Sequence, residues 1–215
     1  MIAVGSGALG LALRRDDGDG ASSTTTTTPD DTTTTEVATL DELSGPARDL
    51  AELLAAGRTR TYHARYQGST VGQDDGAIVI ESWAKDGRFR QDVGFDVGGV
   101  AVQRSTFVLD ERGVSCQRSG EEPWSCTDLP RSEVQGADPL TGSALAQLKH
   151  AAVGEQEGAV DGRPARCFIV TYDAQTTEMC VSPDGIPLQI RTTESQLVVD
   201  LLEDVVDEAA FEPPA

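Results

Sequence analysis

The four cysteines are the residues whose spacing is most informative about chemistry. They stand at Cys116, Cys126, Cys167 and Cys180, and four cysteines allow three disulfide pairings. A hairpin that pairs Tyr172 with Gln175 would place Cys167 and Cys180 directly opposite each other. Cβ atoms of directly opposed residues lie about 4.5–5.5 Å apart, slightly wide of disulfide geometry but within reach of a small adjustment.

Cys116 and Cys126 bracket the turn residues at 120–123 in the same way, so this spacing favours the pairs Cys116–Cys126 and Cys167–Cys180. Such bonds persist in oxidising compartments, which places the chain outside the cytoplasm. Free thiols are one alternative. A metal site is another, but no Cys-x-x-Cys occurs and the sequence has two histidines, whereas zinc usually takes four ligands at short paired spacings.

Other residue types with catalytic potential do not form a recognisable constellation. His63 falls in an alternating strand pattern and His150 ends a helical one, and no Gly-x-Ser-x-Gly nucleophile motif is present. The glycine-rich stretch 94–99 indicates a turn with no helix after it to hold a phosphate. Adjacent acidic pairs would face opposite ways on a strand, so they predict no paired-carboxylate site. We expect no enzymatic activity and no cofactor.

The charge of the chain argues against nucleic acid as a partner. Asp and Glu number 36 against 17 Lys and Arg, a net charge of -19. A surface of this sign repels phosphate backbones. The ordinary interpretation is a solvated acidic surface that aids solubility.

Two helices are expected among the elements that position these residues. The first begins with Ser44 as N-cap, carries Pro46 in its first turn and ends at Gly57. The second spans 139–149 after Asp138 as N-cap. Both have the apolar stripe of a helix that packs on one face.

The rest of the chain is typical of an antiparallel sheet. Runs with a period of two, separated by turn residues, predict strands. They are 61–66, 77–84, 88–93, 100–109, 113–117, 123–127, 164–172, 176–182, 187–194 and 196–206. The expected fold is α+β, a mainly antiparallel sheet with both helices packed on one side.

Large apolar side chains on these elements have two possible roles. One is to fill the core, and the other is to line an apolar groove between sheet and helix. The candidates for ligand lining are Trp83, Phe89, Phe107, Phe168, Leu145 and Leu148.

The N-terminal part differs from the rest. Residues 2–13 form an apolar run that is shorter than the roughly 20 residues of a spanning helix. We interpret 1–14 as the remnant of a signal or membrane anchor, 15–38 as a disordered Thr- and Asp-rich linker, and 39–215 as the folded domain. An untargeted tail is the alternative for 1–14.

Several motifs resemble the bacterial lipoprotein-carrier superfamily, which includes a periplasmic lipoprotein chaperone, a stress-sensing regulator of an anti-sigma factor and mycobacterial lipid-binding lipoproteins. The likeness covers about 45–214. It rests on an opening helix, the Tyr62-x-Ala64-x-Tyr66 strand, a following strand with Trp83, and Arg88-Phe89-Arg90. The tail adds the run at 182–188 and Asp207-x-x-x-Phe211-x-Pro213-Pro214.

The resemblance implies an open half-barrel with helices over its concave face and a hydrophobic cavity between them. It implies binding of acyl chains or lipidated proteins without catalysis. The cysteine pairs are similar to those of actinobacterial secreted members, and arginine outnumbers lysine by 15 to 2. No cysteine follows the apolar N-terminal run for lipid attachment.

Two functions follow as hypotheses. The first is an extracytoplasmic, non-catalytic protein of the cell envelope, secreted or membrane-anchored, that binds a lipid or another hydrophobic molecule. The second is a sensory or scaffolding domain that contacts another envelope protein, held near the membrane by the linker.

Overall fold

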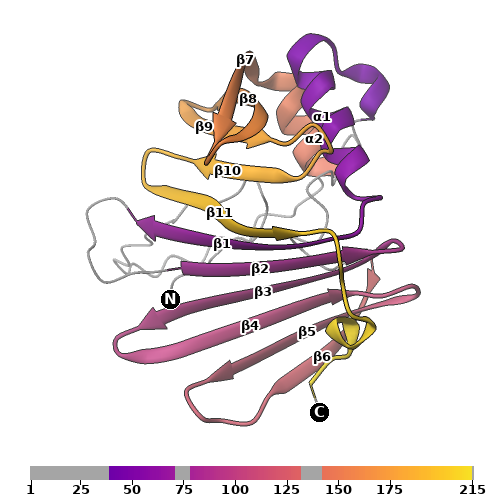
Figure 1. Cartoon of the computed structure of the whole chain (residues 1–215), viewed down its shortest axis with the longest axis vertical. Helices are drawn as coiled ribbons and strands as arrows, with labels where there is room; N and C mark the ends of the chain where they lie inside the picture. The colour runs from indigo at the N-terminus through magenta and orange to yellow at the C-terminus, as the bar shows by residue number, and fades with distance from the viewer. Residues whose placement is uncertain (1–38, 71–77, 132–141, 215) are drawn as a thin grey trace, which may run out of the picture.

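The computed structural model describes residues 39–70, 78–131 and 142–214, and within them eleven antiparallel strands form one sheet (Figure 1). The order across the sheet is β6-β5-β4-β3-β2-β1-β11-β10-β9-β8-β7. The strands are β1 (Tyr62–Thr70), β2 (Ile78–Lys85), β3 (Arg88–Val97), β4 (Val100–Val108), β5 (Arg112–Ser119), β6 (Ser125–Pro130), β7 (Ala152–Val160), β8 (Arg163–Tyr172), β9 (Gln175–Val181), β10 (Pro187–Arg191) and β11 (Ser195–Glu203). The sheet is open, and together with the helices it makes the expected α+β half-barrel.

The first and last strands of the chain meet in the middle of the sheet. β1 pairs with β11, with Tyr66 opposite Val199 and a register shift between Arg65 and Tyr66. In every other neighbouring pair, the two strands follow one another in the sequence. The fold therefore consists of two meanders, β1–β6 and β7–β11, and the pairing of β1 with β11 joins them into one sheet.

The helices pack at the β7–β9 end of the sheet (Figure 1). α1 runs over Gly45–Gly57 as expected, and α2 is seen over Gly142–His150. Residues 139–141 of the second predicted helix lie outside the described residues. Leu50 and Leu54 of α1 and Leu148 of α2 pack against Phe168 and Met179 of the sheet.

The two faces of the β1–β4 region differ in character. The inner face, which continues the side covered by the helices, carries Tyr62, Tyr66, Ile80 and Ala84. The outer face carries the alternate residues, such as Trp83. Because successive side chains on a strand point to opposite faces, the register fixes both sets together.

The C-terminal segment crosses the outer face. Lys85 and Arg88 both pair with Glu208, with Arg88 Nη2 at 2.7 Å from the carboxylate. The Arg88 guanidinium lies 4.7 Å from the ring centroid of Phe211, which is buried. Arg90 donates to the Ala210 carbonyl over 2.9 Å. The short helix η3 (Glu208–Phe211) is thereby fastened to β3.

One strand was not expected from the sequence. β7 has no hydrophobic alternation, because its residues 154–158 are Gly-Glu-Gln-Glu-Gly and are exposed. It forms because β8 offers it a complete set of pairing partners, from Thr171 opposite Ala152 to Arg163 opposite Val160. β3 also runs on to Val97, so the stretch 94–99 is mostly strand and the turn is confined to Gly98-Gly99.

The expected N-terminal anchor remnant (1–14) and linker (15–38) lie outside the described residues. In the part of the chain that the structure describes, no helix has the length and apolar character to cross a membrane.

Candidate functional site

A cavity of about 370 Å³ lies where the helical cover of the inner face ends. Its roof is the C-terminal end of α1 and the residues just after it, from Leu54 to Thr59, and its floor is the inner face of β1–β4 and β9–β11. Cavities that bind small molecules span roughly 300–1,000 Å³ and are mostly apolar. The volume and position therefore make it the candidate binding site.

Most lining side chains are apolar. They include Leu54, Ala55, Tyr62, Tyr66, Ile80, Ala84, Phe89, Val108, Met179, Pro187, Ile190 and Leu197. Ser82 and Gln91 add polar groups to the floor, and their side chains contact each other at 3.5 Å. The cavity is therefore mainly apolar, with polar groups in its floor.

The two tyrosines of β1 differ in the hydrogen bonds that their hydroxyls make. The Tyr66 hydroxyl donates to the Pro187 carbonyl over 2.9 Å, and burial raises its pKa well above the usual value. Tyr62 has no hydrogen-bond partner among the described residues. Burial raises the pKa of Tyr62 to about 12, although the positive charge of Arg58 opposes that rise. Both hydroxyls therefore stay protonated at neutral pH, and that of Tyr62 can still donate.

The six residues expected to line a cavity are separated in the structure. Phe89 lines the cavity. Leu145, Leu148 and Phe168 lie in the core between the helices and β8–β9. Phe107 is fully buried in a small cluster with Val114 and Cys116. Trp83 lies on the outer face, so the structure does not bring these six residues together.

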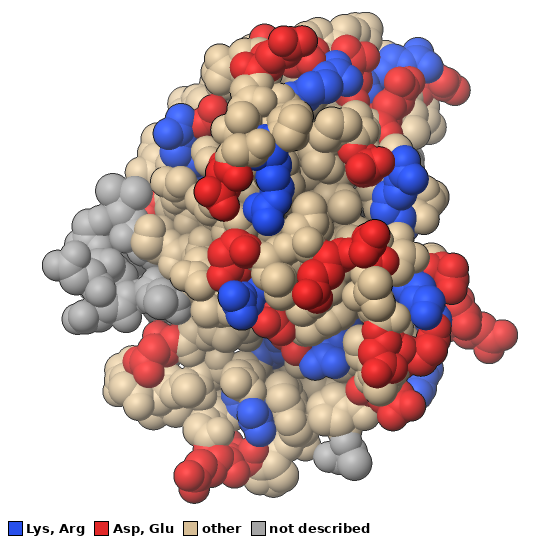
Figure 2. All heavy atoms as spheres, in the orientation of Figure 1, with Lys and Arg blue, Asp and Glu red and all other residues tan. Residues whose placement is uncertain are grey.

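Trp83 belongs to a stack on the outer face. The rings of His63 and Trp83 are nearly parallel, with centroids 4.8 Å apart. The Arg90 guanidinium lies 4.6 Å from the Trp83 ring centroid and 5.1 Å from that of Phe107. An open hollow of about 690 Å³ lies beside this stack, between His63, Trp83 and the chain from Leu202 to Asp207. On the face shown in Figure 2, acidic and basic side chains are interspersed.

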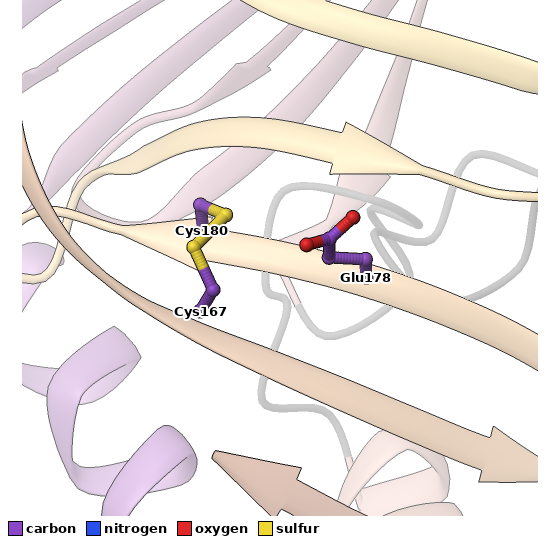
Figure 3. A group of neighbouring side chains, drawn as sticks. All are labelled: Cys167, Glu178 and Cys180. Atoms are coloured by element: carbon purple, nitrogen blue, oxygen red, sulfur yellow. A yellow bond between two sulfur atoms is a disulfide. The ribbon is translucent and has the colours of Figure 1, made fainter. Parts of the chain in front are cut away.

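Both predicted disulfides are present, Cys116–Cys126 and Cys167–Cys180. The register predicted for the second hairpin is also observed, with Tyr172 opposite Gln175. Glu178 lies near the second disulfide (Figure 3). Its carboxylate pairs with Arg191 and both sulfurs are covalently bonded to each other, so this group is not a metal site.

Most residues of the cavity lining are not marked as such by the sequence pattern. The period of two in the predicted strand 61–66 implies that Tyr62, Ala64 and Tyr66 share a face, and in the structure they do. However, the pattern gives no sign that this face borders an open space instead of packed side chains. Met179, Ile190 and Leu197 come from strands distant in sequence, and only the pairing of β1 with β11 brings them to the same cavity.

Comparisons with known proteins identify the fold. No protein-family model and no curated protein sequence matches the chain. Among solved structures, "Crystal structure of MucB" matches with a TM-score of 0.52 and 20% identity over 80% of this chain. The match covers 64% of the MucB chain, slightly less than two thirds of its length.

Two further structures show weaker likeness. "Crystal structure of MucB in complex with MucA(peri)" matches with a TM-score of 0.41 and 17% identity, over 74% of this chain and 56% of that one. An uncharacterized conserved protein from Thermus thermophilus matches with a TM-score of 0.48 and 12% identity, over 78% of this chain and 93% of its own. The first MucB structure shares the fold of this chain, and at 20% identity the likeness shows the fold alone.

Proposed function

We propose that this chain is a non-catalytic binding protein that acts outside the cytoplasm and takes a lipid or another hydrophobic cell-envelope molecule into the cavity beneath α1. The observation that carries the proposal is the cavity itself, about 370 Å³ with mainly apolar lining. The fold shared with MucB and the two disulfides are consistent with this setting. A membrane anchor at 1–14 forms part of the same proposal.

The side chains that line the cavity support a binding role without catalysis. The groups that line it among the described residues are apolar side chains, hydroxyls, one amide and three arginines. Neither histidine lines it. The lining side chains that the structure describes therefore include no pair that could act as a general base and a nucleophile.

Two neighbouring residues of β2 provide a direct test. Ile80 lines the cavity, whereas Val79 is 39% exposed on the outer face. An Ile80→Trp variant fills part of the cavity and should reduce uptake of a fluorescent fatty acid by about tenfold or more, an effect of roughly 1.4 kcal/mol. A Val79→Trp variant adds the same ring on the opposite face and should bind as the original protein does.

Lipid extraction gives an independent measurement. Mass spectrometry of the purified protein should find a copurifying amphiphile, at a lower level in Ile80→Trp. If no lipid copurifies and the fluorescent fatty acid does not bind, the proposal is wrong.

A second candidate function is contact with another envelope protein, and a specific observation favours it. Val205 is 75% exposed, the largest exposure among the large hydrophobic side chains described, and it borders the hollow beside Trp83 and His63. Crosslinking in cells from a photoreactive amino acid placed at position 205 should then recover a protein partner. Recovery of none would argue against this candidate while leaving the lipid proposal intact.

A further inference from the structure

The charged residues of the cavity gather at one end of it. Tyr62, Ala84 and Phe89 form one row across β1–β3, next to the β2–β3 turn. Arg58 precedes β1 by four residues, and Arg131 donates to the carbonyl of Gly87 in that turn over 3.1 Å. These two arginines and Arg88 therefore stand at the turn end of the cavity.

The opposite end is apolar. Leu197 pairs with Gly68, six residues further along β1 from Tyr62. Ile190 lies opposite Leu197, and Met179 lies opposite Ile190. At about 3.3 Å per residue, these side chains begin about 20 Å from the row of Tyr62. The cavity thus has a polar end and an apolar end.

The arginines differ in how much of their charge is already compensated. Arg88 pairs with Glu208 on the outer face. Arg131 donates to the carbonyls of Asp110 and Gly87 and has no carboxylate partner among the described residues. These two carbonyls hold the guanidinium in place at the mouth of the cavity, and no carboxylate among the described residues compensates its positive charge. It would attract an anion.

The Tyr62 hydroxyl is a second, independent observation. It lies in the lining of the cavity without a hydrogen-bond partner among the described residues. Tyr62 is 9% exposed, and its hydroxyl is not one of the buried polar atoms that lack a partner, so it stays accessible from the cavity. An oxyanion bound at this end would accept from the hydroxyl and from Arg131 together.

We infer that the occupant of the cavity is a single-chain amphiphile with an anionic head group, bound with its carboxylate or phosphate at Arg131, Arg58 and Tyr62 and its alkyl chain directed toward Met179 and Leu197. This inference rests on the proposed function, because it specifies the ligand of the same cavity. The volume supports one chain, since about 370 Å³ is near the lower end of the range for small-molecule sites.

Three soluble probes with the same tail test the head group. Dodecyl phosphate, dodecanol and dodecyltrimethylammonium differ in charge at one end alone. Their affinities for the full chain are measured by displacement of aminoanthracene, with inorganic phosphate as a further competitor. We expect dodecyl phosphate to bind about tenfold more tightly than dodecanol, because hydrogen bonds to a charged group are stronger than those to a neutral one. The ammonium probe should bind most weakly.

A pair of arginine variants locates the effect. Arg58→Gln with Arg131→Gln should remove the preference for dodecyl phosphate and change dodecanol binding by less than about twofold. Tyr62→Phe should also lower dodecyl phosphate binding while both arginines are kept. This single variant tests the head-group site if the double arginine variant does not fold. Arg112→Gln is the matched control, because Arg112 is an exposed arginine that pairs with Asp128 away from the cavity lining.

The outcomes separate the two proposals. Equal binding of all three alkyl probes would overturn the anionic head group and leave the hydrophobic cavity in place. Binding of inorganic phosphate as tight as that of dodecyl phosphate would show a free-anion site and overturn the amphiphile. If none of the alkyl probes displaces aminoanthracene, the proposed function fails together with this inference.

Discussion

Gly57 and Gly185 are in backbone contact at the point where α1 meets the turn between β9 and β10. A Cβ placed on Gly57 would lie 2.1 Å from the Gly185 carbonyl oxygen. A Cβ placed on Gly185 would lie 2.0 Å from the Leu53 carbonyl oxygen, and Gly185 has a φ of +86°. The end of the helix can approach this closely because neither residue has a side chain. The contact therefore holds α1 over the cavity.

Substitution of either glycine is expected to destabilise the protein and to move α1. Gly57→Ala and Gly185→Ala should each lower the free energy of unfolding by about 2–3 kcal/mol, because backbone atoms must shift to make room. Chemical denaturation measures the loss. Gly154→Ala is the control, since no atom lies within 4 Å of its Cβ position. A loss as large for Gly154→Ala would show that the close contact is not the cause.

The two tyrosines of β1 should respond differently to loss of the hydroxyl. Tyr66→Phe leaves the Pro187 carbonyl without its donor, which should cost about 1–2 kcal/mol of stability. Tyr62→Phe removes a hydroxyl with no partner among the described residues and should leave stability within about 0.5 kcal/mol. Thermal unfolding of both variants checks the difference. Equal losses would contradict the hydrogen-bond assignment.

The two disulfides should differ in accessibility. Cys126 is exposed, whereas Cys167 and Cys180 are 4% and 3% exposed. Limited reduction followed by alkylation and mass spectrometry should therefore label Cys116 and Cys126 first. Removal of either bond by paired Cys→Ala changes should cost about 2–4 kcal/mol. Loss of Cys167–Cys180 should cost roughly 1 kcal/mol more, because both of its cysteines are buried, whereas Cys116 is buried and Cys126 is exposed.

Stability should decrease in acid through carboxylates that pair with arginine or lysine. Hydrogen bonds from Lys85 and Arg88 lower the pKa of Glu208 below its usual 4.5. A hydrogen bond from Arg166 likewise lowers the pKa of Glu155. A carboxylate with a lowered folded-state pKa stabilises the fold above its unfolded pKa and loses that effect as pH falls through the folded value. The melting temperature should thus stay level at neutral pH and fall below about pH 4.5.

The contribution of Glu208 can be isolated at the C-terminal segment. Glu208→Gln should weaken the attachment of this segment to Lys85 and Arg88, so amide hydrogen exchange at 206–213 should rise several-fold. Glu212→Gln is the control, because Glu212 is an exposed carboxylate of the same segment. Unchanged exchange in Glu208→Gln would show that Phe211 and the backbone contacts hold the segment without the ion pairs.

Features that depend on residues close together in the chain were predictable from the sequence. α1 begins after Ser44 and ends at Gly57, as the proline in its first turn and the final glycine predict, although the Ser44 side chain makes no capping hydrogen bond. The register of the β8–β9 hairpin, and with it Cys167–Cys180, follows from a two-residue turn that permits few pairings. The alternation of Tyr62, Ala64 and Tyr66 also correctly assigned one face of β1. These features need no knowledge of the rest of the chain.

The cavity and β7 were decided by tertiary structure. β7 has a polar, glycine-containing sequence and becomes a strand because β8 provides hydrogen-bonding partners. The cavity exists because β1 pairs with β11 and because the contact between Gly57 and Gly185 places the end of α1 at the edge of the cavity. Volume left between packed elements depends on contacts between residues far apart in the chain, such as Tyr66 and Pro187. Local periodicity carries no information about such distances, so the sequence could name apolar side chains but not which of them face an open space.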